Sequence, residues 1–452
     1  MTSPPNLHRT ILNQLGNMPQ ARRYWVAYSG GMDSHTLLSA MGKVRDELPD
    51  VRIGAIHVNH GLQPEAGSWA RHAEAVCHGL GIACRVLTAD ARAAPGQSQE
   101  AAARRARYGV MEAIVGSDEI LLAAHHRDDQ AETLLLQMIR GAGPRGLAAM
   151  PRLARFGAGW LARPLLDVPR AAIREYAKSQ GLVWIEDKSN DDPRFDRNYL
   201  RHEILPRLQA RWPAIGHTLG RVAAHQADMA RQLDLLARED LENLCRNGEN
   251  TLSCNRLRRL TECRQRNALH AWFRRLGLPA PNAVHLQRIL ADVLGAGPDR
   301  EPRVCWQGVQ VRRYRDHLYA GAPLSRHDPG QVILWSLDRS LRLSHGRLEA
   351  RRAMGTGLRA AACSGNKVEV RFRQGGERCR IAANAHIRRL KRLFQERGIV
   401  PWERDRIPLV FIEGQLAAVA GLWVCAPFEA NGDEQGWVLQ WSEEFYGYSG
   451  GS

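Results

Sequence analysis

The sequence has no long hydrophobic run. Among its 452 residues, no segment approaches the roughly 20 consecutive apolar residues of a transmembrane helix. Residues 1–8 also lack the apolar core of a secretory signal peptide. We therefore expect a cytoplasmic protein that makes no contact with a membrane.

Cysteine pairs of the metal-binding or redox type are missing as well. The nine cysteines are scattered along the chain, and no two of them form a Cys-x-x-Cys pair. Zinc knuckles and thioredoxin-like centres need such closely spaced pairs, so neither is expected. In a cytoplasmic protein, widely spaced cysteines of odd number favour buried, reduced thiols.

Lysine is scarce, although the chain is strongly basic. Lysine and arginine together number 63 against 47 aspartates and glutamates, which gives a formal net charge of +16, and only five of the 63 are lysines. The preference for arginine indicates compositional bias and carries little functional information. The excess of positive charge favours a polyanionic partner, which for a protein of this kind points to nucleic acid.

A glycine-rich turn follows the first predicted strand, residues 24–28. The turn consists of Ser29, Gly30, Gly31, Met32, Asp33 and Ser34. Adjacent glycines permit positive φ and expose backbone N–H groups, and a helix predicted from about residue 33 adds its own unpaired N–H groups and positive dipole end. Such a nest binds a phosphate-sized anion. The alternative is a plain turn with Asp33 or Ser34 as helix N-cap.

The amino-acid sequence of this turn excludes two common kinds of nucleotide-binding loop. The spacing and the lysine of a Walker loop are absent, and so is the G-x-G-x-x-G pattern of dinucleotide-binding folds. The hexapeptide S-G-G-M-D-S instead resembles the pyrophosphatase loop of ATP pyrophosphatases. These enzymes adenylate a substrate and release pyrophosphate.

Strand and helix patterns alternate through the first 180 residues. Strands are predicted over residues 52–58, 82–87, 119–124 and 160–166, and helices over residues 64–81, 98–115, 129–140 and 170–180. This alternation predicts an α/β fold with a parallel sheet and helices on both faces. Ligands of such sheets bind beyond the carboxyl ends of the strands.

Three domains are expected. Residues 1–213 form the predicted nucleotide-binding domain, and residues 214–325 form a mostly helical domain that ends in strand-like alternation. Residues 332–447 follow a Pro/Gly-containing linker and are predicted to form a small α+β domain with a basic helix over residues 386–397.

Two polar clusters follow the next predicted strands. Residues 57–62 read H-V-N-H-G-L, and their backbone is placed to pair with an adenine edge, although turn residues that cap a strand explain them too. On the following helix, Glu100, Arg104 and Arg107 share one face. Surface ion pairs are one explanation, and an arginine that steadies phosphate charge is the other.

The third cluster is H-H-R-D-D-Q-A-E-T at residues 125–133. Asp129 and Glu132 fit a helix capping box. If the helix begins earlier, His125, Asp129 and Glu132 lie on one face, which suits a magnesium ion or an ammonium group. A dedicated metal-hydrolase site is a competing interpretation, but it leaves the glycine turn unexplained.

Seven motifs in order resemble the tRNA(Ile)-lysidine synthase family. They are S-G-G-M-D-S, H-V-N-H-G-L, E-A-A-A-R-R-A-R-Y, H-H-R-D-D-Q-A-E-T, R-G-A-G-P-R-G-L-A-A-M, R-P-L-L and W-I-E-D-K-S-N-D-D-P-R-F-D-R-N, and they lie within residues 24–206. Residues 386–405 are similar to a motif in the last domain of the family's longer form. Ala124 stands where the family often has glycine, which affects only backbone freedom.

The resemblance implies a PP-loop ATPase fold, Rossmann-like, and an ATP-dependent change to one tRNA base. Members adenylate the 2-carbonyl of the wobble cytidine in the isoleucine tRNA with a CAU anticodon, and the ε-amine of free L-lysine then displaces AMP. ATP is the co-substrate, and Mg²⁺ is the expected metal ion. The isoleucine tRNA and free lysine are the expected partners, and a homodimer is left open.

The resemblance also assigns roles to individual residues. The residues expected to bind ATP are Ser29, Gly30, Gly31, Met32, Asp33, Ser34, His57 and His60, with Asp33 a possible Mg²⁺ ligand. The expected catalytic residues are Asp33, Arg107, Asp129 and Glu132, helped by Arg104. Asp128, Asp129 and Glu132 are the expected lysine-binding residues, with Glu132 the first choice. A carboxylate or His125 would accept the proton that lysine must lose.

A larger set of residues is expected to contact tRNA. Its members are Arg140, Arg145, Arg197, Asn198, Arg201, Arg388, Arg389, Lys391 and Arg392. Of these, Arg197, Asn198 and Arg201 are expected to line the anticodon entrance together with Asp187, Ser189 and Asn190. Arginines of the helical domain are a further group: Arg256, Arg258, Arg259, Arg264, Arg266, Arg274 and Arg275. The alternative for the arginines of the two C-terminal domains is a solvated arginine surface.

Three rival functions share parts of this pattern. A tRNA thiolase has the same kind of loop but needs cysteines at the site, and none lies in the clusters. A synthetase of the GMP synthetase type needs a glutaminase module, and none is evident. A non-catalytic RNA-binding protein would not need the acidic cluster.

Overall fold

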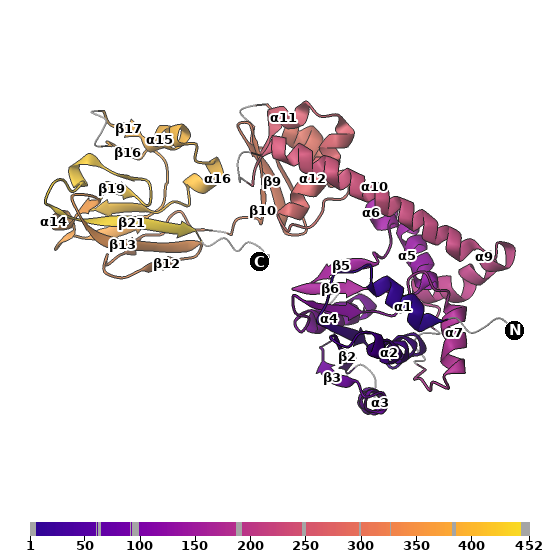
Figure 1. Cartoon of the computed structure of the whole chain (residues 1–452). Coiled ribbons are helices and arrows are strands. Elements are labelled where there is room, and N and C mark those ends of the chain that lie inside the picture. The colour runs from indigo at the N-terminus through magenta and orange to yellow at the C-terminus, as the bar shows by residue number, and fades with distance from the viewer. Residues whose placement is uncertain are drawn as a thin grey trace. The chain divides into compact units, whose positions relative to one another are not determined.

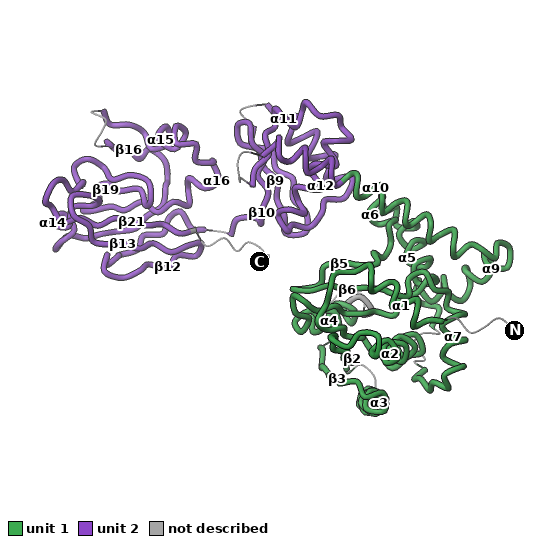
Figure 2. Tube along the Cα trace, in the orientation of Figure 1, with its two compact units in different colours: residues 1–233 green, residues 234–452 purple. Residues whose placement is uncertain are grey.

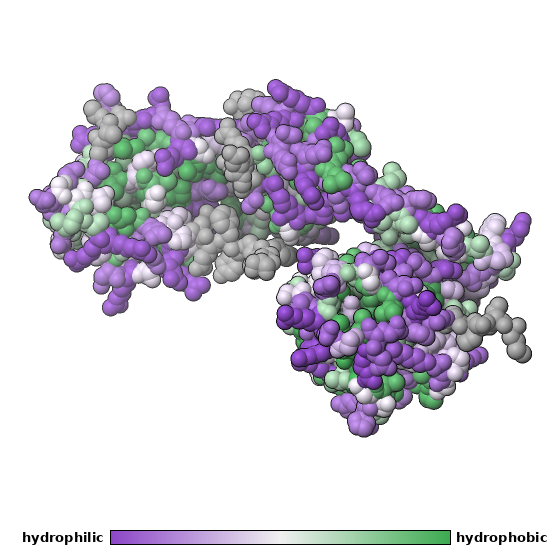
Figure 3. Space-filling model, viewed as in Figure 1, coloured by the Kyte–Doolittle hydropathy of each residue, from purple (hydrophilic) through white to green (hydrophobic). Residues whose placement is uncertain are grey.

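The computed structural model describes residues 6–59, 61, 65–90, 92, 99–186, 192–245, 250–297, 300–325, 327–381 and 386–443. It divides into two compact units, Met1–Leu233 and Asp234–Ser452 (Figures 1 and 2). Within the described ranges, no helix combines the length and the apolar character needed to cross a membrane. Hydrophilic side chains dominate much of the visible face of each unit in Figure 3.

A six-stranded sheet forms the centre of the first unit. Its strand order is β3-β2-β1-β4-β6-β5. The strands are β1 (Arg23–Ala27), β2 (Arg52–Asn59), β3 (Ala83–Thr88), β4 (Glu119–Leu122), β5 (Leu153–Phe156) and β6 (Gly159–Ala162). All neighbours pair in parallel except β5, which pairs antiparallel with β6. The predicted parallel α/β sheet is confirmed, whereas the short β5–β6 hairpin was not foreseen.

Helices cover both faces of this sheet, as predicted. The helices between residues 6 and 211 are α1 (Leu7–Leu15), α2 (Met32–Val44), α3 (Ala66–Gly79), α4 (Gln99–Glu112), α5 (Arg127–Ile139), α6 (Pro144–Leu147), α7 (Arg170–Ser179), α8 (Asp196–Tyr199) and α9 (Leu205–Arg211), with the short elements η1 (Arg45–Glu47) and η3 (Leu200–Ile204). Along β1, Tyr24 and Val26 pack into one apolar cluster and Trp25 into another. The alternation places α1, α2, α3 and α7 on one side and α4 on the other.

One helix of 30 residues, α10 (Ile215–Leu244), contains the division between the two units. The sequence predicted one or two helices here, and the structure has one. The domain boundary at residues 213/214 remains a prediction.

The first part of the second unit combines helices with a four-stranded sheet. The helical elements are α11 (Cys254–Arg258), α12 (Glu262–Arg275), α13 (Ala283–Arg288) and η4 (Ile289–Leu294). The sheet has the order β7-β10-β9-β8, formed by β7 (Leu252–Ser253), β8 (Arg303–Trp306), β9 (Val309–Tyr314) and β10 (His317–Gly321). Trp272 and Phe273, both 0% exposed, lie in the core between them.

The remainder of the second unit contains two larger sheets. One consists of β11 (Ile333–Leu334), β15 (Val368–Arg371), β18 (Leu409–Ile412), β19 (Gln415–Val419) and β20 (Trp423–Val424). The other consists of β12 (Leu341–Leu343), β13 (Gly346–Met354), β21 (Gln435–Glu443) and β14 (Leu358–Arg359). The short helical elements are α14 (Ala360–Cys363), α15 (Leu390–Arg397), α16 (Pro401–Arg404) and η5 (Ala426–Phe428).

The basic helix predicted over residues 386–397 is shorter than expected. It begins at Leu390, because Arg388 and Arg389 form strand β17 (Arg388–Arg389), which pairs with β16 (Arg378–Cys379). A strand of two residues is too short to produce a recognisable periodicity in the sequence. Arg388 and Arg389 therefore precede the helix, and Lys391 and Arg392 lie within it.

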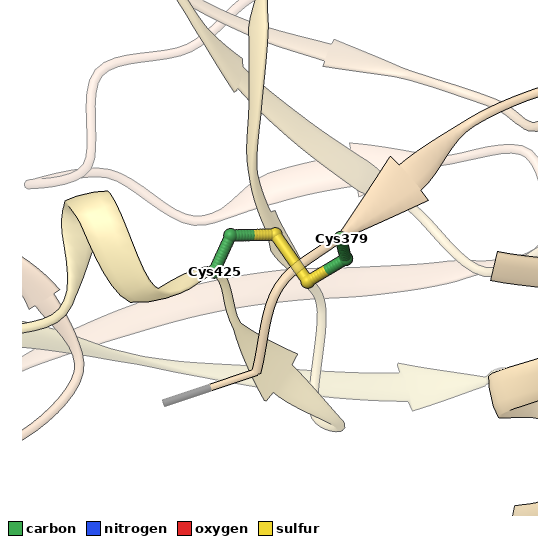
Figure 4. The surroundings of a disulfide bond; sticks show 2 residues. All are labelled: Cys379 and Cys425. Atoms are coloured by element: carbon green, nitrogen blue, oxygen red, sulfur yellow. A yellow bond between two sulfur atoms is a disulfide. The ribbon is translucent and has the colours of Figure 1, made fainter. Parts of the chain in front are cut away.

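The expectation of reduced cysteines is wrong for one pair. Cys379 and Cys425 form a disulfide with their Cα atoms 5.6 Å apart (Figure 4). The two lie 46 residues apart in sequence, and the neighbouring bridge between Ile381 and Cys425 brings their segments together. The other seven cysteines are free thiols.

Candidate active site

Serine side chains fold the glycine turn after β1. The Oγ of Ser34 accepts a hydrogen bond from the Ser29 N–H at 3.1 Å and donates to the Gly31 carbonyl at 3.0 Å. Gly31 is the N-cap of α2, and no side chain caps this helix. The alternative with Asp33 or Ser34 as N-cap is therefore wrong, and among the described residues no side chain makes a capping hydrogen bond at this helix start.

Position 30 of the turn requires glycine. Its φ is +89°, and a Cβ built on it would lie 2.7 Å from Cδ1 of Ile185. The Gly30 carbonyl also accepts a hydrogen bond from the Ile185 N–H at 3.0 Å. The turn is thus tied to the segment that begins the last of the seven motifs.

A cavity of about 320 Å³ opens at the carboxyl ends of β1, β2 and β4. Its lining includes Ser29, Gly31, Asp33, Ser34, His57, Asn59, Arg104, Arg107, Tyr108, His125 and Asp129. Three clusters that are far apart in sequence therefore meet at one edge of the sheet, as the strand-end argument predicts. Gly30, Met32, Asp128 and Glu132 are not among the lining residues, and His60 lies outside the described residues.

Asp33 presents a carboxylate to this cavity. Its side chain is 31% exposed. Its Oδ1 atom has no hydrogen-bond partner within the described parts of the chain, and its Oδ2 lies 3.6 Å from Nε2 of His126. An oxygen of this kind is suited to a metal ion or to a reacting group.

His126 connects two acids. Its buried ring caps α5, because Nδ1 accepts a hydrogen bond from the backbone N–H of Asp129 at 3.3 Å. In return, the Asp129 carboxylate accepts a hydrogen bond from the backbone N–H of His126 at 3.0 Å. The predicted capping box between Asp129 and Glu132 is therefore replaced by one between His126 and Asp129. Nε2 of His126 lies 3.4 Å from Asp129 and 3.6 Å from Asp33. Burial lowers the pKa of His126, but the carboxylates of Asp129, Asp33 and Asp128 outweigh it and raise that pKa above its ordinary value.

Glu132 is fully buried and paired with two arginines. It accepts from Nε of Arg197 at 2.8 Å and from Nε of Arg201 at 2.7 Å. Arg201 also donates to Asp129 at 2.9 Å. Burial raises the pKa of Asp129, but His126, Arg197, His125 and Arg201 outweigh it and hold that pKa below its ordinary value. The arginines expected at the anticodon entrance thus contact the acids expected to bind lysine.

The remaining site residues have varied surroundings. Burial lowers the pKa of His125 to about 3, and nearby arginines add to this effect. Asn198 is buried and donates to the Asp192 carbonyl at 2.9 Å. Arg140 is exposed at the C-cap of α5, and Arg145 lies in α6. Asp187, Ser189 and Asn190 lie outside the described residues.

The basic residues of the second unit divide into paired and exposed ones. Arg388 and Arg392 both contact Glu396, while Arg389 and Lys391 are exposed. In the helical part, Arg264 pairs with Asp240, Arg266 with Glu262 and Arg274 with Asp234, and Arg256, Arg258 and Arg275 donate to other groups of the unit. For these six, internal contacts account for part of the basic surface.

His57, which was expected to bind ATP, also contacts the glycine turn, because its Nδ1 lies 3.0 Å from the Tyr28 carbonyl at the start of that turn. The sequence did not indicate the contacts of Arg163. Arg163 is 6% exposed and donates from Nη1 to the Pro151 carbonyl at 2.7 Å. Arg163 begins the R-P-L-L motif, which was the available signal, but the motif alone does not indicate what the guanidinium contacts.

Comparison with known proteins shows similarity over nearly the whole chain. Family models match residues 5–208 (PP-loop domain), 252–319 (TilS substrate binding domain) and 368–441 (TilS substrate C-terminal domain). The tRNA(Ile)-lysidine synthase of Coxiella burnetii is 41% identical over 432 residues, 95% of each chain. That of Methylococcus capsulatus is 43% identical over 422 residues, 93% of this chain and 96% of the relative.

A solved structure gives weaker similarity. The U34-tRNA thiolase NcsA from Methanococcus maripaludis, solved with its [4Fe-4S] cluster, has a TM-score of 0.42 and 17% identity over 48% of this chain and 76% of that chain. Similarity at this level carries no functional argument.

Proposed function

The chain belongs to the tRNA(Ile)-lysidine synthase family, and from this premise we propose how its residues perform the family's reaction. That reaction adenylates the 2-carbonyl of the wobble cytidine in the isoleucine tRNA with a CAU anticodon. The ε-amine of lysine then displaces AMP, and lysidine, AMP and pyrophosphate are the products. We assign the protein to the C–N bond-forming ligases and place it in the cytoplasm.

ATP occupies the cavity of about 320 Å³, with its phosphates at the glycine turn. Two observations support phosphate binding at this turn. No side-chain hydrogen bond caps the start of α2, and the turn that precedes the helix is held by the hydrogen bond from the Ser29 N–H to Oγ of Ser34. Mg²⁺ fits as a partner of Asp33, whose Oδ1 has no hydrogen-bond partner among the described groups. Among those same residues, no three His, Cys, Asp or Glu side chains are placed together to hold a metal, but Mg²⁺ needs only one or two carboxylates when phosphates and water complete its shell. When bound, it would neutralise phosphate charge.

Arg104 and Arg107 stabilise the charge that develops on the α-phosphate. Both line the same cavity as residues of the turn. Fixed cations that face a developing negative charge act without reorganising during the reaction, which makes them efficient. The cytidine oxygen then reaches the α-phosphorus while pyrophosphate leaves toward the turn.

Lysine binds next to Asp129, which lines the cavity, with Asp128 as the second carboxylate. Glu132 is already paired with Arg197 and Arg201, so its proposed role changes from lysine ligand to holder of these guanidiniums. A carboxylate of the site or the neutral ring of His125, whose pKa burial lowers to about 3, accepts the proton lost by lysine.

The domains proposed at residues 214–325 and 332–447 hold the tRNA. Exposed Arg389 and Lys391 contact its phosphates, and Arg140 and Arg145 do so beside the active site. A tRNA thiolase is disfavoured, because within the described residues no cysteine lines the cavity.

The observation that carries the proposal is the meeting of the glycine turn, two arginines and an acid in one cavity. The test is incubation of the purified protein with ATP, labelled lysine and an isoleucine tRNA transcript. Label should enter only a transcript with a wobble cytidine, and pyrophosphate should form in equal amount. Label entering a transcript with uridine at that position, or entering without ATP, would refute the proposal.

A further inference from the structure

The basic motif of the last domain has two halves with different surroundings. In its first half, Arg389 and Lys391 are exposed. Its last residues belong to a segment of residues 401–406, which we call the bracket and which extends one residue beyond the motif. Both arginines of the bracket are buried: Arg404 is 6% exposed and Arg406 7%. A buried guanidinium cannot reach an RNA phosphate without rearrangement, so the bracket needs another explanation.

The bracket contacts the four-stranded sheet of the preceding domain. The ring of Trp402 stands edge-on to Tyr319 and Tyr314, with centroids 5.3 and 6.4 Å apart. The Arg312 guanidinium lies over the Trp402 ring, 5.2 Å from its centroid. The half-buried Trp402 of one domain therefore contacts side chains of β9 and β10, which belong to the other domain (Figure 2 shows α16, β9 and β10 in one unit).

Arg404 joins the two domains by hydrogen bonds. Its Nη2 donates to the Tyr314 hydroxyl at 2.8 Å, and its Nε donates to the Ile399 carbonyl of its own domain at 2.9 Å. The guanidinium also lies 5.5 Å from the Tyr314 ring centroid. The Arg404 guanidinium thus donates one hydrogen bond within its own domain and one to the preceding domain.

The bracket also holds the linker between the domains. Arg406 donates to the Ser325 carbonyl at 2.7 Å and to its hydroxyl at 3.1 Å. Nε2 of His327, also in the linker, lies 2.7 Å from the Asp405 carbonyl. Within the last domain itself, Nε2 of His345, between β12 and β13, lies 2.8 Å from the Arg406 carbonyl. The bracket therefore contacts the linker at Ser325 and His327.

We propose that the bracket locks the domains of residues 250–321 and 333–443 into one rigid tRNA-binding body. Trp402 and Arg404 then serve tRNA binding by fixing the spacing of two RNA-contacting surfaces, and they do not touch RNA. Two surfaces at a fixed, matching spacing bind as one bivalent ligand, because the second contact forms at high effective concentration. This inference rests on the proposed tRNA binding for its functional half only.

The structural half is tested on the full chain without tRNA. Arg404→Met and Tyr314→Phe remove the interdomain hydrogen bond from opposite sides, and Arg397→Met removes an exposed charge nearby as the matched control. Loosened domains should raise the rate of tryptic cleavage within residues 322–331 several-fold and increase the scattering-derived radius of gyration, with circular dichroism unchanged. The control should match the parent. Parent-like cleavage and scattering in both bracket variants would overturn the bracket.

Tyr314→Phe keeps the test decisive if Arg404→Met does not fold. This substitution deletes only the Tyr314 hydroxyl and leaves all charges and the aromatic ring in place. The packing between the two domains is therefore otherwise unchanged. The two variants should also be non-additive, since they break the same hydrogen bond. Additive effects on cleavage rate would show that the hydroxyl and the guanidinium act separately and would overturn the proposed contact.

The functional half is tested by tRNA affinity over a range of salt concentrations. Tyr314→Phe and Arg404→Met should weaken binding by about tenfold through lost effective concentration, with the slope of log affinity against log salt unchanged because the phosphate contacts are the same. A reduced slope for Arg404→Met would show direct RNA contact and refute the positioning role. If the parent bound no tRNA, the proposed function would fail, while the cleavage and scattering results would still decide the bracket.

Discussion

Replacing Glu132 with glutamine should destabilise the first unit strongly. Glu132 is 0% exposed, and both its oxygens accept hydrogen bonds from arginines at 2.7 to 3.0 Å. The glutamine keeps the volume but removes the charge, so that among the described residues Arg197 and Arg201 retain Asp129 as their ionic partner. Breaking a buried pair by removing one partner costs about 3–5 kcal/mol.

The expected change in melting temperature follows from the size of the unit. For a domain of 150–250 residues, each kcal/mol shifts the midpoint by about 2–4 °C. Glu132→Gln should therefore lower the first unfolding transition by about 6–20 °C. Differential scanning calorimetry of the full chain measures this shift, because the two units can unfold in separate transitions.

Asp33→Asn is the matched control for this prediction. The Asp33 side chain is 31% exposed, and one of its oxygens has no hydrogen-bond partner in the described parts of the chain. We expect little change in melting temperature and complete loss of lysidine formation. If Glu132→Gln also melted like the parent while losing activity, Glu132 would act directly on a substrate, and the holding role proposed for it would be refuted.

Three further predictions concern other parts of the chain. Gly30→Ala forces positive φ on a residue with a Cβ, which costs about 1–2 kcal/mol, and creates the close contact with Ile185. The KM for ATP should therefore rise. Gly79→Ala is the control, because a Cβ there meets nothing within 4 Å, and it should leave the KM for ATP unchanged. Dithiothreitol should lower the stability of the second unit by about 4 kcal/mol in guanidinium unfolding, because it opens a loop of 46 residues, and it should not affect a Cys379→Ser variant further. Replacing Arg389 and Lys391 together by glutamine should reduce the salt slope of tRNA binding by about 1.8, and an unchanged slope would favour a solvated surface.

The sequence predicted the α/β sheet and the strand-end clusters because those signals are local. The glycine turn, the apolar strands and the helical spacing of residues 125–132 are each contained within about ten residues, and parallel pairing brings their ends together. The lining of the cavity by Asp33, Arg107 and Asp129 follows from this geometry.

The partners of Glu132 could not be predicted in the same way. Arg197 and Arg201 follow it by 65 and 69 residues, across two strands and several helices. Helical spacing placed Glu132 near His125 and Asp129, but no local pattern indicates that its oxygens are already paired. The bracket shows the same limit, since Trp402 lies in a recognised motif while its contacts are tyrosines more than 80 positions earlier.

The shared imidazole of His126 has a consequence for the two substrates that the enzyme must combine. Its Nε2 lies between Asp33 and Asp129, the acids proposed to serve the nucleotide–metal complex and lysine. Because one imidazole interacts electrostatically with both acids, a cation bound by either acid alters the free energy of binding a cation at the other. By thermodynamic reciprocity, the factor by which nucleotide changes the affinity for the amino acid equals the factor by which the amino acid changes the affinity for nucleotide.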